Sequence, residues 1–303
     1  SYNLMSTMRA GIIVLGPLLA RFGKARVSSP GGCNIGFRPI DIHLEALKKM
    51  GVKYKIIDGY INANAKNGLV GAKIKFPKIS VGATENLMIA ACLAKGQTVL
   101  SNCAIEPEIK DLSNFLCSIG AKIVWTGRRQ VKIIGVKTFK QSNYKIMFDR
   151  IEAGTMLIAG AINQGNLKIT GIESSILETE IDLLKKIGAK INQKKNEIII
   201  KGNKKIKNIN IKTSPYPGVA TDIQAQLMVL LCKANKRSTI KEDIFENRFQ
   251  SIPELKRMNA KIEVKGNQAI IEGNTIFKGA QVMATDLRAS ASLVLAALCA
   301  KGK

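Results

Sequence analysis

The sequence lacks apolar segments long enough to cross a membrane, and its start lacks the features of a signal peptide. The longest apolar runs, residues 227–232 and 289–300, are too short or too interrupted for a membrane-spanning helix. No charged, apolar and small-residue triplet opens the chain. The 303 residues, 46% of them apolar, suffice for two domains that each bury a core. We therefore expect a globular, cytoplasmic protein without membrane insertion.

Cysteine pairs at metal-binding or redox spacing are also absent. The six cysteines include no CxxC pair, and the chain has one histidine, His43. We therefore predict free thiols and no metal site. Four of the cysteines fall in apolar helical patterns, where a thiol packs in the core as a small hydrophobe: Cys92, Cys117, Cys232 and Cys299.

Acidic residues are few relative to basic ones. The chain has 47 Lys and Arg against 22 Asp and Glu, which gives a formal net charge of +25. Such an excess is typical of proteins that bind nucleic-acid phosphates. However, the lysines are scattered, aromatic residues make up 5%, and no stretch interleaves Lys or Arg with stacking Phe or Tyr. The pattern favours a solvated basic surface over nucleic-acid binding, and it is compatible with a small anionic substrate.

The sequence does contain an internal repeat. An amphipathic helical pattern that closes on a cap and continues into a strand-like segment recurs four times at nearly equal spacing. The caps are Gly51, Gly120, Gly188 and Asn259. A second, more apolar helical pattern precedes these segments and closes in turns such as residues 94–96, 163–165 and 300–302.

This alternation of helices and strands predicts α/β units packed around pseudo-symmetry axes. The more apolar helices should be buried centrally, with the sheets outside. Three units would form each domain, and we place the boundary near Met147, so that residues 1–147 and 148–303 form two repeat domains. Because the repeat starts and stops part-way, we expect the first domain to lack an N-terminal part and the second a C-terminal part.

The apolar helical patterns begin with cations, which is unusual. The positive end of the helix dipole makes a cation there unfavourable by up to ~1 kcal/mol. Four such cations recur: Arg9, Lys78, Arg150 and Arg288. Either neighbouring carboxylates or a phosphorylated substrate would compensate them, and the sequence leaves both open. Three aspartates at the same positions, taken alone, are interpreted as helix caps: Asp149, Asp222 and Asp286.

The best single phosphate candidate is residues 78–84, Lys-Ile-Ser-Val-Gly-Ala-Thr. Gly82 would let the backbone approach closely, while helix N–H groups and the Lys78 ammonium face one anion. The segment is not a Walker A motif, and no GxGxxG accompanies it.

Residues 29–43, Ser-Pro-Gly-Gly-Cys-Asn-Ile-Gly-Phe-Arg-Pro-Ile-Asp-Ile-His, form a second unusual segment. Its glycines and proline around Cys33 predict an exposed loop, whereas a structural cysteine is normally buried in a regular element. Arg38 would favour a Cys33 thiolate and bind an anion. The alternative is an ordinary loop with an incidental cysteine. His43 begins a helix, where we interpret it as a cap or edge contact rather than a general base.

With these residues in view, the chain resembles the bacterial UDP-N-acetylglucosamine enolpyruvyl transferases, which open peptidoglycan synthesis. The resemblance spans nearly the whole chain. Its most specific segments are residues 7–10 (Thr-Met-Arg-Ala), 30–33 (Pro-Gly-Gly-Cys), 38–43 (Arg-Pro-Ile-Asp-Ile-His), 78–84, 245–249 (Phe-Glu-Asn-Arg-Phe) and 284–290 (Ala-Thr-Asp-Leu-Arg-Ala-Ser).

The resemblance implies two inverse α/β domains, barrel-like and each built from three βαβαββ units, with the active site between them. It also implies that Cys33 is the loop acid that protonates C3 of phosphoenolpyruvate and is alkylated by fosfomycin. Asp222 becomes the catalytic base. The positions that match contacts to UDP-N-acetylglucosamine are Arg9, Arg38, Pro39, Ile40, Asp41, Ile42, Lys78, Ile79, Ser80, Val81, Asp222 and Ile244.

The implied chemistry is an addition followed by an elimination. The sugar 3′-hydroxyl is a poor nucleophile at neutral pH and needs a carboxylate such as Asp222 to take its proton. Attack at C2 and protonation at C3 give a tetrahedral adduct, and loss of phosphate regenerates the enol ether. Arg38 and other cations would stabilise the anionic groups. No metal or organic cofactor is required.

Several alternatives stay open. The sequence shows neither the family's N-terminal Lys-Asn pair nor its C-terminal Arg, so we expect this chain taken by itself to be poorly active. The rivals are a shikimate-pathway enolpyruvyl transferase, a catalytically silent UDP-sugar-binding fragment or paralogue, and a basic nucleic-acid-binding protein. The sequence does not determine the oligomeric state.

Overall fold

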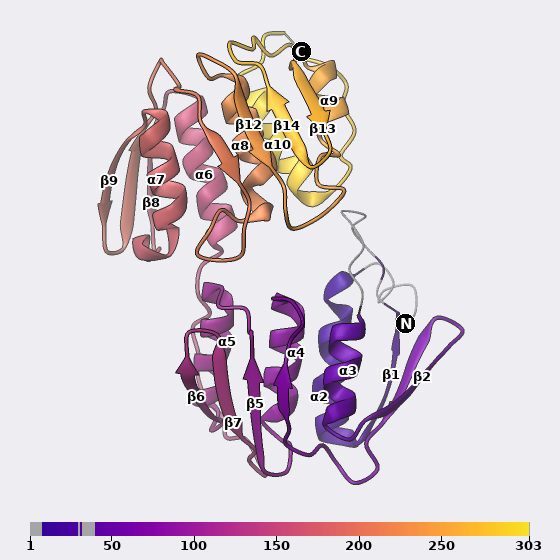
Figure 1. Ribbon diagram of the computed structural model, residues 1–303. Coiled ribbons are helices and arrows are strands. Elements are labelled where there is room, and N and C mark those ends of the chain that lie inside the picture. Colours follow the sequence, from indigo (N-terminus) through magenta and orange to yellow (C-terminus); the bar gives the residue numbers. More distant parts are fainter. Residues whose placement is uncertain (1–7, 30, 32–39, 303) are drawn as a thin grey trace. The chain divides into compact units, whose positions relative to one another are not determined.

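The computed structural model describes residues 8–29, 31 and 40–302 (Figure 1). The described residues divide into two compact units. Unit 1 runs to Met147, and unit 2 begins at Phe148. Each unit has its own apolar core, formed by residues of that unit alone.

Unit 1 contains two sheets and the helices that pack on them. Its elements are η1 (Arg9–Val14), α2 (Leu15–Phe22), β1 (Lys24–Ser28), α3 (Asp41–Lys49), β2 (Lys53–Ile57), β3 (Tyr60–Asn64), β4 (Lys73–Lys75), α4 (Val81–Ala91), β5 (Gln97–Ser101), α5 (Pro107–Ser118), β6 (Lys122–Gly127) and β7 (Gln130–Ile134). The sheets have the strand orders β1-β3-β2 and β4-β5-β7-β6. The β4–β5 pair is parallel and the other pairs are antiparallel.

Unit 2 repeats this arrangement. Its elements are α6 (Arg150–Ile162), β8 (Asn166–Thr170), η2 (Ser174–Leu177), α7 (Glu178–Ile187), β9 (Lys190–Lys194), β10 (Glu197–Lys201), β11 (Asn210–Lys212), η3 (Thr221–Ile223), α8 (Gln224–Cys232), β12 (Ser238–Lys241), α9 (Ile252–Arg257), β13 (Ile262–Lys265), β14 (Gln268–Ile271) and α10 (Leu287–Leu298). The strand orders are β8-β10-β9 and β11-β12-β14-β13. The β11–β12 pair is parallel, as β4–β5 is.

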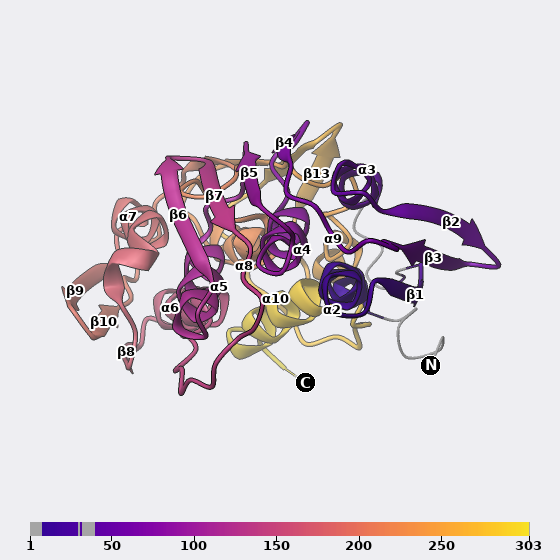
Figure 2. The same ribbon diagram turned by 90° about the horizontal axis from the view of Figure 1, so that it is seen from below.

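The predicted repeat is therefore confirmed in the described residues. The series β4-α4-β5-α5-β6-β7 and β11-α8-β12-α9-β13-β14 are both complete βαβαββ units, called here the β4–β7 repeat and the β11–β14 repeat. The apolar helices lie inside: every residue of α8 is buried, and α8 packs against α6 and α10 (Figures 1 and 2). In unit 1, α4 packs against α2 in the same way.

The four predicted caps also adopt one geometry. Gly51, Gly120, Gly188 and Asn259 all have positive φ, the left-handed conformation that ends a helix. After each cap, the next amide donates to a carbonyl in the last turn of the helix, as Val52 does to Leu47 and Ala260 does to Leu255. A later amide then donates to the carbonyl just before each cap: Val70 to Met50, Lys140 to Ile119, Lys207 to Ile187 and Lys278 to Met258.

The described cysteines are free thiols. Burial raises the pKa of Cys92 and of Cys232 to about 12, so both are unreactive core residues, as predicted. The prediction for Cys117 is wrong, because that side chain is exposed near the end of the amphipathic helix α5. Cys299 is half-buried.

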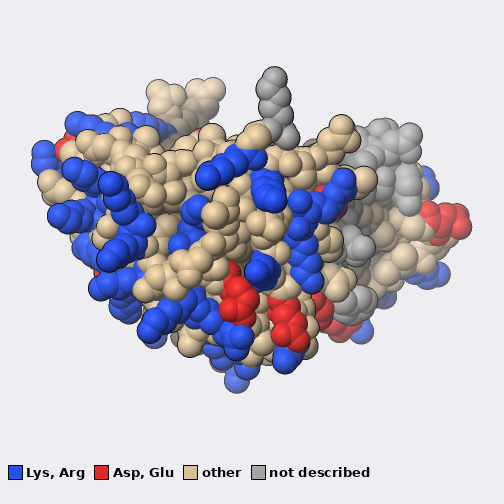
Figure 3. Space-filling view, turned by 90° about the horizontal axis from the view of Figure 1, so that it is seen from above, with Lys and Arg blue, Asp and Glu red and all other residues tan. Residues whose placement is uncertain are grey.

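Across the described residues, no helix combines the length and apolarity needed to cross a membrane. Lys and Arg side chains spread over the face shown in Figure 3 and do not form one continuous stripe. This distribution agrees with a solvated basic surface.

Candidate functional site

Part of the predicted site cannot be placed. Cys33, Arg38 and Pro39 lie outside the described residues, and so does the side chain of Arg9, whose backbone begins η1. Their roles remain predictions.

The segment that follows Arg38 and Pro39 leads into α3. The Ile40 carbonyl accepts hydrogen bonds from the His43 and Leu44 amides at 3.0 and 3.1 Å, which starts the helix. Asp41 is exposed, whereas Ile42 is buried in the core of unit 1. Asp41 therefore has a side chain available to a ligand, whereas the side chain of Ile42 does not.

His43 joins this segment to α4. Its ring is buried, and its Nδ1 lies 3.0 Å from Asn86 Nδ2. The Asn86 Oδ1 accepts from the Gly16 amide at 2.8 Å, so Nδ2 is the donor and His43 Nδ1 the acceptor. The other edge of the ring faces the first turn of α4, since a Cβ on Gly82 would lie 3.5 Å from His43 Cε1. The expectation of a cap or edge contact is corrected: His43 is a buried link between α3 and α4.

Two predicted stretches, residues 40–42 and 78–81, therefore meet in unit 1. Ser80 is the N-cap of α4: its Oγ accepts from the Ala83 amide at 3.3 Å, and its carbonyl accepts from Thr84 Oγ1 at 2.8 Å. Lys78 is exposed just before this cap, while Ile79 and Val81 pack against the core. An exposed ammonium beside a helix N-terminus suits an anion such as a phosphate.

The other predicted catalytic residue, Asp222, lies in unit 2. Asp149 and Asp286 are N-caps, as predicted, because each accepts two amide hydrogen bonds from the helix that follows. The cap interpretation fails for Asp222, which lies within η3 and makes no such bonds in the described structure. Its carboxylate is free for other partners.

Those partners are two arginines. Arg248 Nη2 donates to Asp222 Oδ1, and Arg288 Nη2 lies 3.3 Å from Oδ2. Arg248 is 5% exposed, and its Nε also donates to the Thr221 carbonyl at 3.3 Å. The Asp222 side chain stays 41% exposed, so the pair of ion pairs borders solvent. The result is a carboxylate held by two guanidinium groups at an accessible surface.

A buried carboxylate organises the backbone around this group. Glu242 is 3% exposed, and its Oε1 accepts from the amides of Ile244 and Phe245 at 2.8 and 3.1 Å. Its Oε2 accepts from Thr221 Oγ1 at 3.0 Å. The Ile244 amide is therefore occupied, and only its carbonyl and half-buried side chain are available to a ligand.

The structure also shows which groups compensate the cations at the helix starts. Arg150 is buried beside Glu180, and its guanidinium lies 5.6 Å from the Tyr216 ring centre. Arg288 pairs with Asp222. Both are compensated by neighbouring groups of the protein, whereas Lys78 is exposed.

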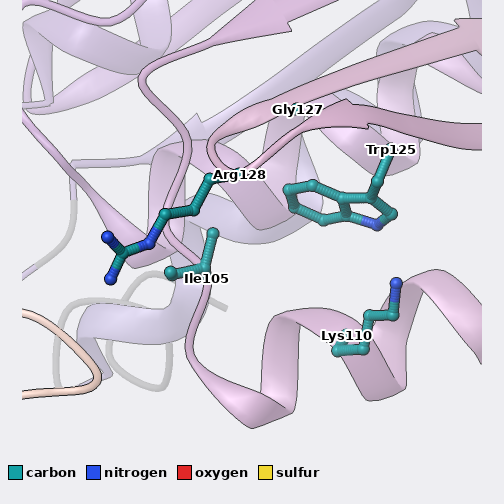
Figure 4. A pocket seen from close by; sticks show the side chains of 5 residues that line it. All are labelled: Ile105, Lys110, Trp125, Gly127 and Arg128. Atoms are coloured by element: carbon teal, nitrogen blue, oxygen red, sulfur yellow. The ribbon is translucent and has the colours of Figure 1, made fainter.

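Sequence reasoning missed Arg248, Thr221 and Glu242 as parts of one group. Arg248 was visible within the segment Phe-Glu-Asn-Arg-Phe, but nothing local indicates its partner. A separate pocket of about 180 Å³ in unit 1 was not anticipated either (Figure 4). It is lined by Ile105, Lys110, Trp125, Gly127 and Arg128, with the Lys110 ammonium 5.5 Å from the Trp125 ring centre.

Comparisons with known proteins agree on one family. Residues 1–303 match the family described as EPSP synthase (3-phosphoshikimate 1-carboxyvinyltransferase). The chain is 70% identical, over its whole length, to UDP-N-acetylglucosamine 1-carboxyvinyltransferase of Pelagibacter ubique, of which it covers 73%. It is 50% identical over 302 residues to the protein of the same name from Trichlorobacter lovleyi, covering 72% of it.

Solved structures show the same fold. The enolpyruvyl transferase NikO from Streptomyces tendae is 25% identical with a TM-score of 0.83, over 95% of this chain and 69% of that one. The EPSP synthase from Acinetobacter baumannii is 18% identical with a TM-score of 0.70, over 97% of this chain and 71% of that one. The likeness to the latter concerns the fold alone.

Proposed function

The chain belongs to the EPSP synthase family, and we propose that it transfers enolpyruvate from phosphoenolpyruvate to the 3′-hydroxyl of UDP-N-acetylglucosamine. The observation that carries this proposal is the 70% identity, across all 303 residues, to a relative named for that transfer. The reaction would be the first committed step of peptidoglycan synthesis, in the cytoplasm.

The acceptor is proposed to be the nucleotide sugar rather than shikimate 3-phosphate. Relatives named for UDP-N-acetylglucosamine are 50% to 70% identical, whereas the solved EPSP synthase is 18% identical. In unit 1, the exposed Lys78 and the amides at the start of α4 would hold the diphosphate. Asp41, beside them at the start of α3, would contact the nucleoside; Arg9 and the stretch from Arg38 to Ile42 would complete this site.

In unit 2, Asp222 is proposed as the general base. Both of its oxygens accept hydrogen bonds from guanidinium groups, so these donors occupy the positions where a substrate hydroxyl would bond. An anionic substrate that binds Arg248 or Arg288 would draw these donors away from the carboxylate. Asp222 would then accept the 3′-hydroxyl proton only when phosphoenolpyruvate is present. This arrangement supports a base that is released by its co-substrate.

The reaction follows as an addition and an elimination. The deprotonated oxygen attacks C2 of phosphoenolpyruvate while an acid protonates C3, giving a tetrahedral phosphate ester. Removal of a proton from C3 and cleavage of the bond between C2 and the phosphate oxygen then release phosphate and restore the double bond. The arginines would stabilise the carboxylate and phosphate throughout. No step needs a cofactor.

Cys33 is proposed as the acid that protonates C3 and as the site of fosfomycin alkylation. A proton donor tolerates another acid of suitable pKa, so Cys33→Asp should keep measurable turnover while Cys33→Ser should be severely impaired. Both variants should resist labelling by fosfomycin, which mass spectrometry detects. Labelling at another cysteine would contradict the assignment.

The test of the base is Asp222→Asn in the full-length enzyme. The amide keeps the shape of the carboxylate but cannot take a proton, so kcat should fall by about 10²- to 10⁴-fold while UDP-N-acetylglucosamine still binds. Release of inorganic phosphate measures turnover, and calorimetry measures binding.

The matched control is Asp243→Asn, a nearby carboxylate paired with Lys212 at 2.8 Å and not with either arginine. It should leave turnover nearly unchanged. Turnover like that of the wild type in Asp222→Asn would remove Asp222 from the base role.

A further inference from the structure

Glu242 is an unusual residue for this chain, because it is a buried carboxylate that forms no ion pair within the described residues. Burying an ionised carboxylate is costly unless strong hydrogen bonds replace its water. Glu242 accepts three such bonds, two from backbone amides and one from the Thr221 hydroxyl. A net charge of +25 makes a nearby cation easy to supply, yet the hydrogen-bond partners of Glu242 among the described residues are neutral.

The three donors belong to two segments that meet at Asp222. The amides of Ile244 and Phe245 lie in the connection between β12 and α9, which also carries Arg248. Thr221 lies in η3, directly before Asp222. Glu242 therefore bonds both to the segment that supplies Arg248 and to the segment that supplies the carboxylate.

Arg248 also links the β12–α9 connection to η3. Its Nε donates to the Thr221 carbonyl at 3.3 Å, and its Nη2 donates to Asp222 Oδ1. Thr221 is thus held from two sides, by Glu242 through its hydroxyl and by Arg248 through its carbonyl. A shift of η3 relative to the connection would move Asp222 away from its arginine.

We propose that Glu242 is a positioning residue for the Asp222 base. It acts through Thr221 and the Ile244 and Phe245 amides, which fix η3 against the β12–α9 connection. The inference rests on the proposed function, since it concerns how that reaction's base is aimed. A displacement of about 1 Å in a reacting group can lower a rate by about 100-fold. Loss of this link should therefore lower kcat more than it lowers substrate binding.

The test removes one hydroxyl. Thr221→Val keeps the size and shape of the side chain but leaves Glu242 Oε2 without its donor, whereas Thr221→Ser keeps the hydroxyl. We expect kcat to fall by about 10- to 100-fold in the Val variant, with the KM values changed by less than about 3-fold. The Ser variant should recover most of the rate. Glu242→Ala, which removes all three bonds, should lower kcat further.

The control is Thr98→Val in β5 of unit 1. Thr98 is fully buried, and its hydroxyl has no hydrogen-bond partner among the described residues, so turnover should not change. Thermal unfolding of each variant shows whether a lower rate comes from lost folded protein.

The outcomes separate cleanly. A wild-type rate in Thr221→Val, or equal losses in the Val and Ser variants, would overturn the positioning role while leaving the proposed function intact. A wild-type enzyme that releases no phosphate from phosphoenolpyruvate and UDP-N-acetylglucosamine would overturn the function, and the positioning role with it.

Discussion

The β4–β7 repeat of unit 1 and the β11–β14 repeat of unit 2 share one topology but differ in the connection that follows their second strand. In both, a short strand pairs in parallel with the strand that follows the buried helix. In unit 1, the connection after that second strand is short, residues 102–106. In unit 2, the equivalent connection is residues 242–251 and contains Glu242, Ile244 and Arg248.

The link between this connection and the start of the buried helix differs in charge. In unit 1, Thr84 Oγ1 accepts from the Ala104 amide at 3.0 Å, a neutral bond within the protein. In unit 2, the Glu242 carboxylate bonds to Thr221, and Arg248 reaches Asp222. Both repeats thus link this connection to the start of the buried helix through a threonine hydroxyl, and the longer connection of unit 2 also carries Arg248. On the proposed function, we infer that unit 1 would hold the nucleotide sugar and that unit 2 would carry the general base, Asp222.

The largest expected effect separates the two roles. Arg288→Ala should raise the KM for phosphoenolpyruvate by about 100-fold and change UDP-N-acetylglucosamine affinity only slightly, because a charged hydrogen-bond donor is lost from unit 2. Lys78→Ala should instead lower the affinity for UDP-N-acetylglucosamine by about 10-fold and change the KM for phosphoenolpyruvate only slightly. Steady-state kinetics with each substrate varied in turn measures both.

The matched control is Arg237→Ala, which removes an exposed pair with Glu272 and should change neither constant. If Arg288→Ala and Lys78→Ala weaken the binding of the same substrate, the proposed division of roles between the two units is wrong.

A second contrast concerns how tightly the buried helices pack. A Cβ on Gly16 in α2 would lie 2.2 Å from Asn86 Oδ1 and 2.7 Å from the Asn86 carbonyl oxygen. A Cβ on Gly154 in α6 would meet the Ile223 Cδ1 at 2.6 Å, the end of a flexible side chain. Gly16→Ala should therefore lower the free energy of unfolding of unit 1 by about 2 kcal/mol, and Gly154→Ala that of unit 2 by under about 1 kcal/mol.

Hydrogen exchange of peptides from each unit measures the two effects separately. Equal losses in the two variants would show that the packing around α2 and α6 is equally rigid.

The smallest expected effect is a pH dependence that is stronger in unit 1 than in unit 2. Burial raises the pKa of Glu85 to about 7, and the Glu108 and Glu106 carboxyls add to the shift. The folded state then binds more protons than the unfolded state between the ordinary pKa of 4.5 and about 7, so stability falls as pH rises through this window. Glu85→Gln should remove this loss, and its advantage over the wild type should grow across the window.

Glu180 in unit 2 offers the comparison. Burial also raises its pKa, but a backbone hydrogen bond and Arg150 oppose the shift. Glu180→Gln should therefore show a weaker slope. Hydrogen exchange at several pH values, corrected for intrinsic rates, tests both; a constant difference between Glu85→Gln and the wild type would contradict the account.

Local sequence signals predicted the fold well because helix caps and apolar patterns, which depend on neighbouring residues, mark each repeat. Gly51, Gly120, Gly188 and Asn259 end their helices in the left-handed conformation, which short-range sterics favour for Gly and Asn. The apolar pattern of α8 likewise predicted a fully buried helix.

Local signals failed where a partner is distant in sequence. Asp222 occupies a cap-like position, but its partners are 26 and 66 residues away, and no local pattern indicates them. His43 follows a loop-like segment, yet Asn86, 43 residues on, makes it a buried link. Cys117 shares a helix with apolar residues but lies on its exposed face. The apolar periodicity of a helix does not by itself determine whether one given position is buried.

The most direct test of the central claim is the choice of acceptor. Purified full-length enzyme is given phosphoenolpyruvate with either UDP-N-acetylglucosamine or shikimate 3-phosphate, and the release of inorganic phosphate is followed alongside the mass of the product. The account predicts phosphate release and an enolpyruvyl product with UDP-N-acetylglucosamine alone. Release with shikimate 3-phosphate instead, or with neither acceptor, would contradict it.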